Sequence, residues 1–135
     1  MFAKQHSSVY KKPKIIVICG PTGIGKTAVG IELAGMFGGE IISSDSMQIY
    51  RHMDIGTAKP TPEERAQITH HMIDIVDPDE DFDAAQFLSQ GRAIISKLDS
   101  RGRIPLVVGG TGLYIKALLH GIFQSRLIVS DGRER

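Results

Sequence analysis

Residues 14–27 read KIIVICGPTGIGKT, and this stretch decides the fold of the chain. Its first half, 14–20, is a continuous β-branched run without polar alternation, which is typical of a strand covered on both faces in a parallel sheet. Its second half, 20–27, fits the pattern G-x-x-x-x-G-K-[ST], in which a glycine loop opens a helix and its backbone N–H groups wrap phosphate oxygens. An ordinary glycine turn is the alternative. We expect a strand, a phosphate-binding loop and a helix, in this order.

The loop predicts a binding site for a phosphate, but it leaves open whether that phosphate belongs to ATP or to another diphosphate. Lys26 is expected to neutralise the terminal phosphate, and the Thr27 hydroxyl to bind a Mg²⁺ ion that bridges phosphate oxygens. All residues of the loop are candidates for the site: Gly20, Pro21, Thr22, Gly23, Ile24, Gly25, Lys26 and Thr27.

The rest of the sequence alternates apolar runs with helical patterns. Strands are predicted over 40–45, 71–76 and 104–109, and helices over 26–37, 84–100 and 112–119. A long loop-rich segment separates the second strand from the third, and residues 120–130 contain a further candidate strand. This alternation predicts an α/β fold of three layers, P-loop NTPase-like, with a mostly parallel sheet joined by right-handed crossovers.

The composition fits a single folded unit. With 135 residues and 41% hydrophobic content, the chain is long enough to bury one core. We expect a flexible basic arm over 1–13, a P-loop core over 14–121 and a divergent or truncated tail over 122–135. A lone cysteine, Cys19, and the lack of an apolar run of about 20 residues predict a cytoplasmic protein without disulfide or membrane span. We expect a monomer, and the net charge of +1 excludes a global basic field for nucleic acid.

Asp45 is the acidic residue best placed to act beside the loop. It follows the second predicted strand, and open α/β sheets build their sites at the carboxyl ends of their strands. The alternative is a cap of a turn or helix, because Ser44, Asp45 and Ser46 together are favourable capping chemistry. We interpret Asp45 as a functional residue that would face the phosphate loop.

Four blocks of the sequence are specific enough to indicate a family. They are GPTGIGKT at 20–27, GGEIISSDSMQIYRHMDIGTAKP at 38–60, HHMIDIVDP at 70–78 and VVGGTGLYIKALLHG at 107–121. In this order and spacing they closely resemble tRNA dimethylallyltransferases. The resemblance implies transfer of a dimethylallyl group from dimethylallyl diphosphate to the exocyclic N6 amine of an adenosine beside the tRNA anticodon. The loop then holds the donor's diphosphate, with Mg²⁺ as cofactor.

The resemblance also implies roles for individual residues. Lys26 and Thr22 are expected to stabilise charge on the departing diphosphate, and Asp45 to accept the proton of the amine or to align it. The residues expected to contact the tRNA are Asp45, Ser46, Met47, Gln48 and Thr111. The Gln48 amide offers a donor and an acceptor to the adenine edge, with a solvated turn residue as the alternative. For Thr111 the alternative is a helix N-cap.

Other charged residues carry weaker predictions. Arg51, Lys59 and Lys116 are candidates for contacts with RNA phosphates, although each alone is better interpreted as a solvated surface charge. His70 and His71 are adjacent and would point to opposite faces of a strand, and no Cys or carboxylate stands at ligand spacing. We therefore expect no zinc site at these histidines.

Three other functions remain open. The first is an adenylate dimethylallyltransferase, which prenylates free adenine nucleotides, although the block RHMDIGTAK at 51–59 favours the tRNA branch. The second is a small-molecule kinase of similar fold, and the third is a phosphate-binding module without catalysis. Members of the resembled family continue well beyond this length, so we expect the chain to be their catalytic-core half.

Overall fold

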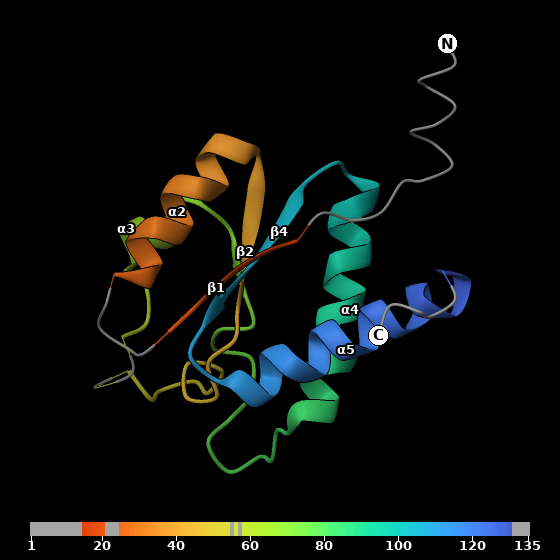
Figure 1. The fold of residues 1–135 in the computed structure, drawn as a ribbon. Helices are drawn as coiled ribbons and strands as arrows, with labels where there is room; N and C mark the ends of the chain where they lie inside the picture. The colour runs from red at the N-terminus through yellow and green to blue at the C-terminus, as the bar shows by residue number, and fades with distance from the viewer. Residues whose placement is uncertain (1–14, 21–24, 55, 57, 131–135) are drawn as a thin grey trace.

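The computed structural model describes residues 15–20, 25–54, 56 and 58–130, with the backbone alone for 123–130. These residues form a parallel sheet in the order β1-β4-β2-β3 with helices on both faces (Figure 1). The strands are β1 (Ile16–Cys19), β2 (Gly39–Ser43), β3 (His70–His71) and β4 (Ile104–Gly109). The helices are α2 (Lys26–Phe37), α3 (Pro62–Gln67), α4 (Ala84–Ser100) and α5 (Gly112–Ser130). The predicted α/β fold with a mostly parallel sheet is confirmed.

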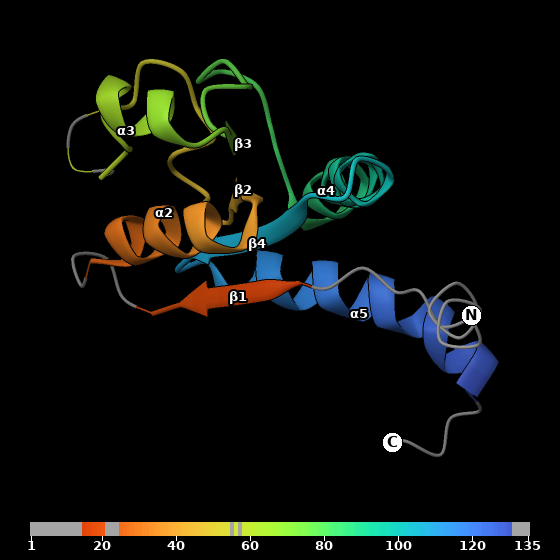
Figure 2. The ribbon, with the colours of Figure 1, turned by 90° about the horizontal axis from the view of Figure 1, so that it is seen from above.

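Helices cover both faces of the sheet (Figure 2). Two apolar clusters fill the spaces between the layers, one on each face of the sheet. Along β2 the side chains of Ile41 and Ile42 point to opposite faces, as the pleat of a strand requires. Ile41 packs in the cluster of α2, which also contains Ala34, Leu106 and Val108. Ile42 packs in the cluster of α4 and α5, which also contains Val107, Phe87, Leu98 and Leu118.

The ends of the helices agree with the local sequence. At the start of α4, the Asp83 carboxylate accepts from the Gln86 N–H and the Gln86 side chain accepts from the Asp83 N–H, which forms a capping box. Helix α2 ends at Gly38, whose φ of 67° is accessible to glycine at little cost. Helices α4 and α5 pack against each other, and Tyr114 stacks on Phe87 with ring centroids 4.7 Å apart.

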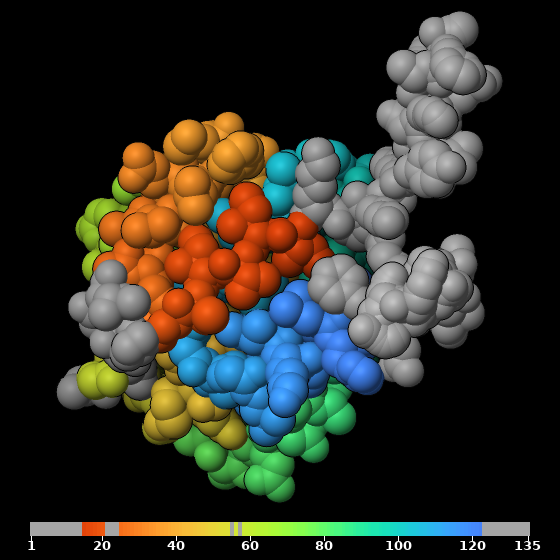
Figure 3. All heavy atoms as spheres, in the orientation of Figure 1, coloured from red at the N-terminus to blue at the C-terminus, as the bar shows by residue number. Residues whose placement is uncertain are grey.

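The prediction that residues 14–20 form a strand covered on both faces is wrong, because one face of β1 is exposed. Val17 is 36% exposed and Cys19 is exposed, while Ile16 and Ile18 pack against the α2 cluster. Figure 3 shows β1 at the surface between α2 and α5. The reason is its position: β1 is at the edge of the described sheet, and the cluster of α4 and α5 contains Ile42 of β2 and Val107 of β4.

Three further elements differ from the predictions. The expected third strand is only His70–His71, followed by an isolated bridge between Tyr50 and Val76. Helix α3 lies in the segment expected to be loop, and its Thr61 side chain forms a capping box with Glu64. The candidate strand over 120–130 is wrong, because α5 continues through these residues to Ser130 without an interruption at 121. No helix in the described part of the chain has the length and apolar character to cross a bilayer.

Candidate active site

A pocket of about 180 Å³ lies at the carboxyl ends of the central strands. Its walls come from the start of α2, the turn after β2, the loop before α3 and the end of β4. The residues that line it are Gly25, Lys26, Thr27, Asp45, Gln48, Ala58, Val108 and Gly109. The structure therefore brings the end of the predicted phosphate loop together with the predicted carboxylate and amide, as expected for a parallel sheet.

The phosphate-binding part of this pocket is the N-terminus of α2. Gly25 precedes the helix with φ 79°, and Lys26 and Thr27 are its first residues. The first N–H groups of a helix have no partner inside the helix, and the helix dipole makes this end positive. An anion in the pocket would meet these N–H groups, as in other phosphate sites. The predictions for Pro21, Thr22, Gly23 and Ile24 fall outside the described residues, while Gly20 lies just after β1.

The Asp45 carboxylate caps a turn, as in the alternative to a functional role, and it also lines the pocket. Its Oδ1 atom accepts hydrogen bonds from the backbone N–H of Met47, at 2.8 Å, and of Gln48, at 3.2 Å. These bonds close the turn after β2 and fix the orientation of the carboxylate. The two interpretations are compatible, because the turn holds Asp45 against the pocket that also contains Lys26.

Hydrogen bonds join the loop after β2 to the loop after β4. Thr111 N–H donates to the Ser44 carbonyl at 3.1 Å, and the Thr111 hydroxyl accepts from the Ser46 N–H at 2.9 Å. The Thr111 side chain therefore bridges to Ser46, while the Thr111 carbonyl accepts from the Ile115 N–H at 3.2 Å at the start of α5, so the N-cap alternative stays a prediction. A Cβ at Gly109 would collide with the Ser44 carbonyl, so only glycine permits this close approach.

The Gln48 side chain is held at both ends. Its Oε1 accepts from the Ser43 hydroxyl at 2.9 Å, and its Nε2 donates to the Ala58 carbonyl at 3.0 Å. Its neighbour Met47 is 44% exposed. The amide thus has a fixed orientation in the wall of the pocket, and a contact with an adenine edge stays a prediction.

The basic residues flanking the turn have different environments. Arg51 pairs with Asp77 at 2.6 Å and also donates to the Ile75 carbonyl. The Lys59 side chain is only 9% exposed and forms ion pairs, so its interpretation as a solvated charge is wrong. Lys116 is exposed on α5. Sequence reasoning missed the part that Lys59 plays in the fold, because its partners lie in other segments.

At the opposite end of the sheet, a cluster of charged residues surrounds Glu40. Its Oε1 accepts from the His71 Nε2 at 2.7 Å, and its Oε2 pairs with Arg103 at 3.3 Å. Burial raises the pKa of Glu40, but the hydrogen bond to His71 and the nearby positive charges outweigh it and leave this pKa below its usual value. His70 turns to the Ile68 carbonyl instead, and in the described residues no three His, Cys, Asp or Glu side chains form a group for a metal.

The pocket residues fit a magnesium ion. Mg²⁺ is bound in such sites through one or two protein oxygens, with substrate phosphates and water completing the shell. Thr27 offers a hydroxyl and Asp45 a carboxylate on the walls of the same pocket. This donor set consists of oxygen atoms only, as Mg²⁺ prefers.

Two models of known families match the chain. A family model described as IPP transferase matches residues 48–134, and a second, described as Isopentenyl transferase, matches residues 13–78. The chain belongs to the IPP transferase family. The match to the family model covers most of the chain and includes Gln48, Lys59 and Thr111.

Individual members of the IPP transferase family are also similar. A tRNA dimethylallyltransferase of Syntrophus aciditrophicus is 61% identical over 114 residues, which are 84% of this chain and 37% of that protein. The structure of the tRNA isopentenylpyrophosphate transferase of Bacillus halodurans matches with a TM-score of 0.79 and 51% identity, over 82% of this chain and 36% of that one. A eukaryotic dimethylallyltransferase described as acting on tRNA matches with a TM-score of 0.76 and 43% identity, over 79% and 27%. This IPP transferase chain therefore spans between 27% and 37% of the length of these relatives.

Proposed function

We propose that this chain forms the catalytic core of a tRNA dimethylallyltransferase. The reaction would transfer the dimethylallyl group of dimethylallyl diphosphate to the exocyclic N6 amine of an adenosine beside the tRNA anticodon. The observation that carries the proposal is the pocket in which the N-terminus of α2 faces Asp45 across the carboxyl ends of β2 and β4. One wall can bind an anion, and the other holds a carboxylate that can take a proton.

The α2 side of the pocket would bind the donor. The diphosphate carries negative charge, which the Lys26 ammonium and the N–H groups at the start of α2 attract. During transfer the bond between the allylic carbon and the bridging oxygen breaks, and negative charge grows on that oxygen. Donors fixed at this position stabilise the transition state more than the ground state, and a single one is worth about 3 kcal/mol.

The β2 side of the pocket would receive the acceptor. The adenine amine forms the new bond between nitrogen and carbon, becomes acidic as it does so, and must lose a proton. Asp45 is suited to accept this proton, because its turn fixes the carboxylate before the substrate binds. Gln48 and Met47 follow in the same turn and would border the base.

A magnesium ion held by Thr27 would supply positive charge to the phosphate oxygens. Two further residues have roles in this scheme. Lys26 binds the diphosphate, and the Thr111 bridge to Ser46 keeps the acceptor turn next to β4.

The test is transfer of labelled dimethylallyl diphosphate into an anticodon stem-loop RNA that has an adenosine next to the anticodon. We expect the label in this RNA and none in the same RNA with guanosine at that position. Preferential transfer to free AMP would instead identify the adenylate branch. Consumption of ATP with phosphorylation of an acceptor would identify a kinase, and either result would contradict the proposal.

A further inference from the structure

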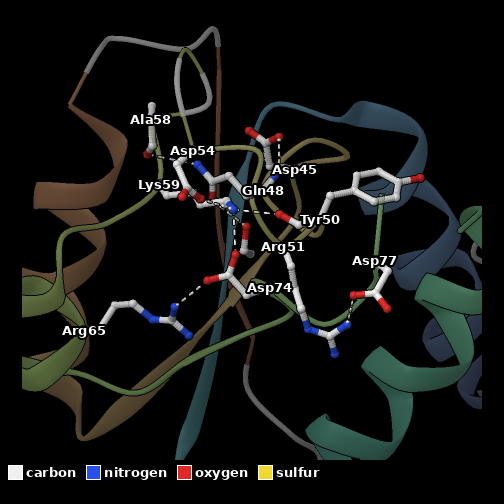
Figure 4. Close-up of polar contacts among 11 residues, drawn as sticks. Asp45, Gln48, Tyr50, Arg51, Asp54, Ala58, Lys59, Arg65, Asp74 and Asp77 are labelled. Atoms are coloured by element: carbon white, nitrogen blue, oxygen red, sulfur yellow. Dashed lines mark hydrogen bonds and ion pairs between the residues drawn. The ribbon is translucent and has the colours of Figure 1, made fainter. Parts of the chain in front are cut away.

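Lys59 has an unusual environment for a lysine close to the surface of the molecule. Its ammonium donates to the Tyr50 carbonyl at 2.7 Å, to Asp54 at 2.7 Å and to Asp74 at 2.6 Å (Figure 4). An ammonium has three N–H donors, so all of them are satisfied by the protein. Burial lowers the pKa of Lys59, but the bonds to the two carboxylates outweigh it and leave this pKa raised, so the group stays charged.

The three acceptors come from three segments of the chain. Tyr50 lies in the turn after β2, Asp54 in the loop that follows, and Asp74 after β3. Backbone hydrogen bonds already join the first and third segments, from Asp74 N–H to the Gln48 carbonyl and from Ile75 N–H to the Ile49 carbonyl. Lys59 belongs to the loop between them, and its ammonium ties this loop to both segments.

The same loops contain backbone in the left-handed region. Ala58 has φ 55° and Asp74 has φ 59°, values that residues with a Cβ rarely adopt. Conformations of this kind persist only where the surroundings hold them, and they gather at functional sites. Here the surroundings are the bonds of Lys59, next to Ala58 in sequence, together with Arg65, which pairs with the second oxygen of Asp74 at 3.1 Å.

The conformation of Ala58 matters because of where its carbonyl points. That carbonyl accepts the hydrogen bond from Gln48 Nε2, and both residues line the pocket beside Asp45. The Lys59 ammonium is therefore connected to the Gln48 amide in the wall of the pocket through Ala58, whose backbone is in the left-handed region.

We propose that Lys59 is a positioning residue: it fixes the loop whose Ala58 carbonyl holds the Gln48 amide in the wall of the pocket. The effect on the reaction rests on the proposed function, because Gln48 lies on the side that would receive the adenosine. Loss of the Lys59 ammonium releases Ala58 from the left-handed region and leaves Gln48 with a mobile amide. Binding of the acceptor weakens, whereas the donor side at α2 is unchanged.

The first experiment needs no substrate. Hydrogen exchange of the Gln48 side-chain amide is measured by NMR in the unmodified chain, in Lys59→Met and in Lys97→Met, a matched control that removes an exposed lysine of α4. We expect exchange about ten times faster in Lys59→Met, as for the loss of one hydrogen bond, and no change in the control. Equal exchange in all three proteins would overturn the proposal.

The second experiment separates positioning from a general loss of structure. In the transfer assay, Lys59→Met is expected to raise KM for the stem-loop RNA about tenfold and to leave KM for dimethylallyl diphosphate unchanged. Adding Lys59→Met to Gln48→Met should then cause no further rise, because the two residues act through one contact. Additive effects, or an equal rise in both KM values, would contradict a role through Gln48.

A milder variant covers the case in which Lys59→Met does not fold. Asp54→Asn removes the charge of a side chain that is 70% exposed and leaves the bonds to Tyr50 and Asp74 in place. We expect a twofold to threefold change of Gln48 exchange in the same direction, and no change would overturn the proposal. If the unmodified chain transfers no prenyl group, the proposed function fails, but the exchange measurements still decide whether Lys59 positions Gln48.

Discussion

The two ends of the same parallel strands both carry charged side chains, but they are organised in opposite ways. At the amino end, Glu40 is almost fully buried and is surrounded by partners from the protein itself, including His71 and Arg103. At the carboxyl end, Lys26 and Asp45 line a pocket. Removing one partner of a buried ion pair destabilises a fold, and charged side chains that line a pocket are candidates for contact with a ligand. We therefore expect Glu40 at the amino end to stabilise the fold, and Lys26 and Asp45 at the carboxyl end to act on the substrates.

The largest effect expected from this comparison is at the carboxyl end. Asp45→Asn keeps the oxygen that accepts from the Met47 and Gln48 N–H groups, so the turn should survive, but the amide no longer accepts a proton. We expect the transfer rate to fall by about 10²-fold to 10⁴-fold, the usual contribution of a general base. Single-turnover assays measure it, with Asp79→Asn as an exposed control. An unchanged rate would remove Asp45 from the mechanism.

At the amino end the expected effect is on stability alone. Glu40→Gln removes the carboxylate that pairs with His71, Arg101 and Arg103. We expect a loss of about 2 kcal/mol in the free energy of unfolding, less than for fully buried pairs because both arginines are more than a third exposed. Urea denaturation measures it, and Glu32→Gln on the exposed face of α2 is the control. If Glu40→Gln changed the affinity for dimethylallyl diphosphate but not the free energy of unfolding, a purely structural role of the amino end would be wrong.

The amino end should also make the fold sensitive to acid. Burial lowers the pKa of His70 below its usual 6.5, so the unfolded chain binds more protons and the stabilising contribution present above pH 6.5 is lost as the pH falls. The lowered pKa of Glu40 acts in the same direction, with a contribution present above pH 4.5 and lost below it. Urea denaturation from pH 8 to pH 4 should show a decreasing midpoint. If the urea midpoint of Glu40→Gln does not change below pH 4.5, the loss of stability in that range belongs to Glu40.

The smallest effect concerns the bridge between the two loops of the pocket. Thr111→Val removes the oxygen that accepts from the Ser46 N–H at nearly constant side-chain volume. We expect a loss of about 1 kcal/mol in the free energy of unfolding, as for one hydrogen bond, and Thr111→Ser should retain most of the stability. Equal stability of the two variants would show that the bridge does not hold the loops.

Much of the fold could be predicted from local sequence. The ranges 26–37, 84–100 and 104–109 agree with α2, α4 and β4. The two helices have apolar residues at helical spacing, the strand is a continuous apolar run, and a glycine or arginine-glycine stop follows or ends each. Helix α3 was missed although Thr61-Pro-Glu-Glu64 is a capping signal, since its six residues show no apolar period. The apolar run at 127–129 predicted a strand, but a helix already begun at Gly112 continues more easily than a new element starts.

The candidate site could be predicted in part, because the residues that define it follow strands or open a helix. Lys26, Thr27, Asp45 and Gln48 were found in this way, and the structure brings them to one pocket. The part played by Lys59 could not be found, because its acceptors at Tyr50 and Asp74 depend on how distant segments meet. Contacts of this kind belong to the tertiary structure and leave no local signal.

The most direct test of the division between the two ends is a calorimetric titration of this chain, in the presence of Mg²⁺, with dimethylallyl diphosphate and with ATP. We predict saturable binding of dimethylallyl diphosphate that is tighter than binding of ATP. In Lys26→Ala this affinity should fall about 100-fold, while in Glu40→Gln it should stay unchanged. Binding of ATP alone, or an affinity for dimethylallyl diphosphate that Lys26→Ala does not alter, would contradict the assignment of the donor site to the N-terminus of α2.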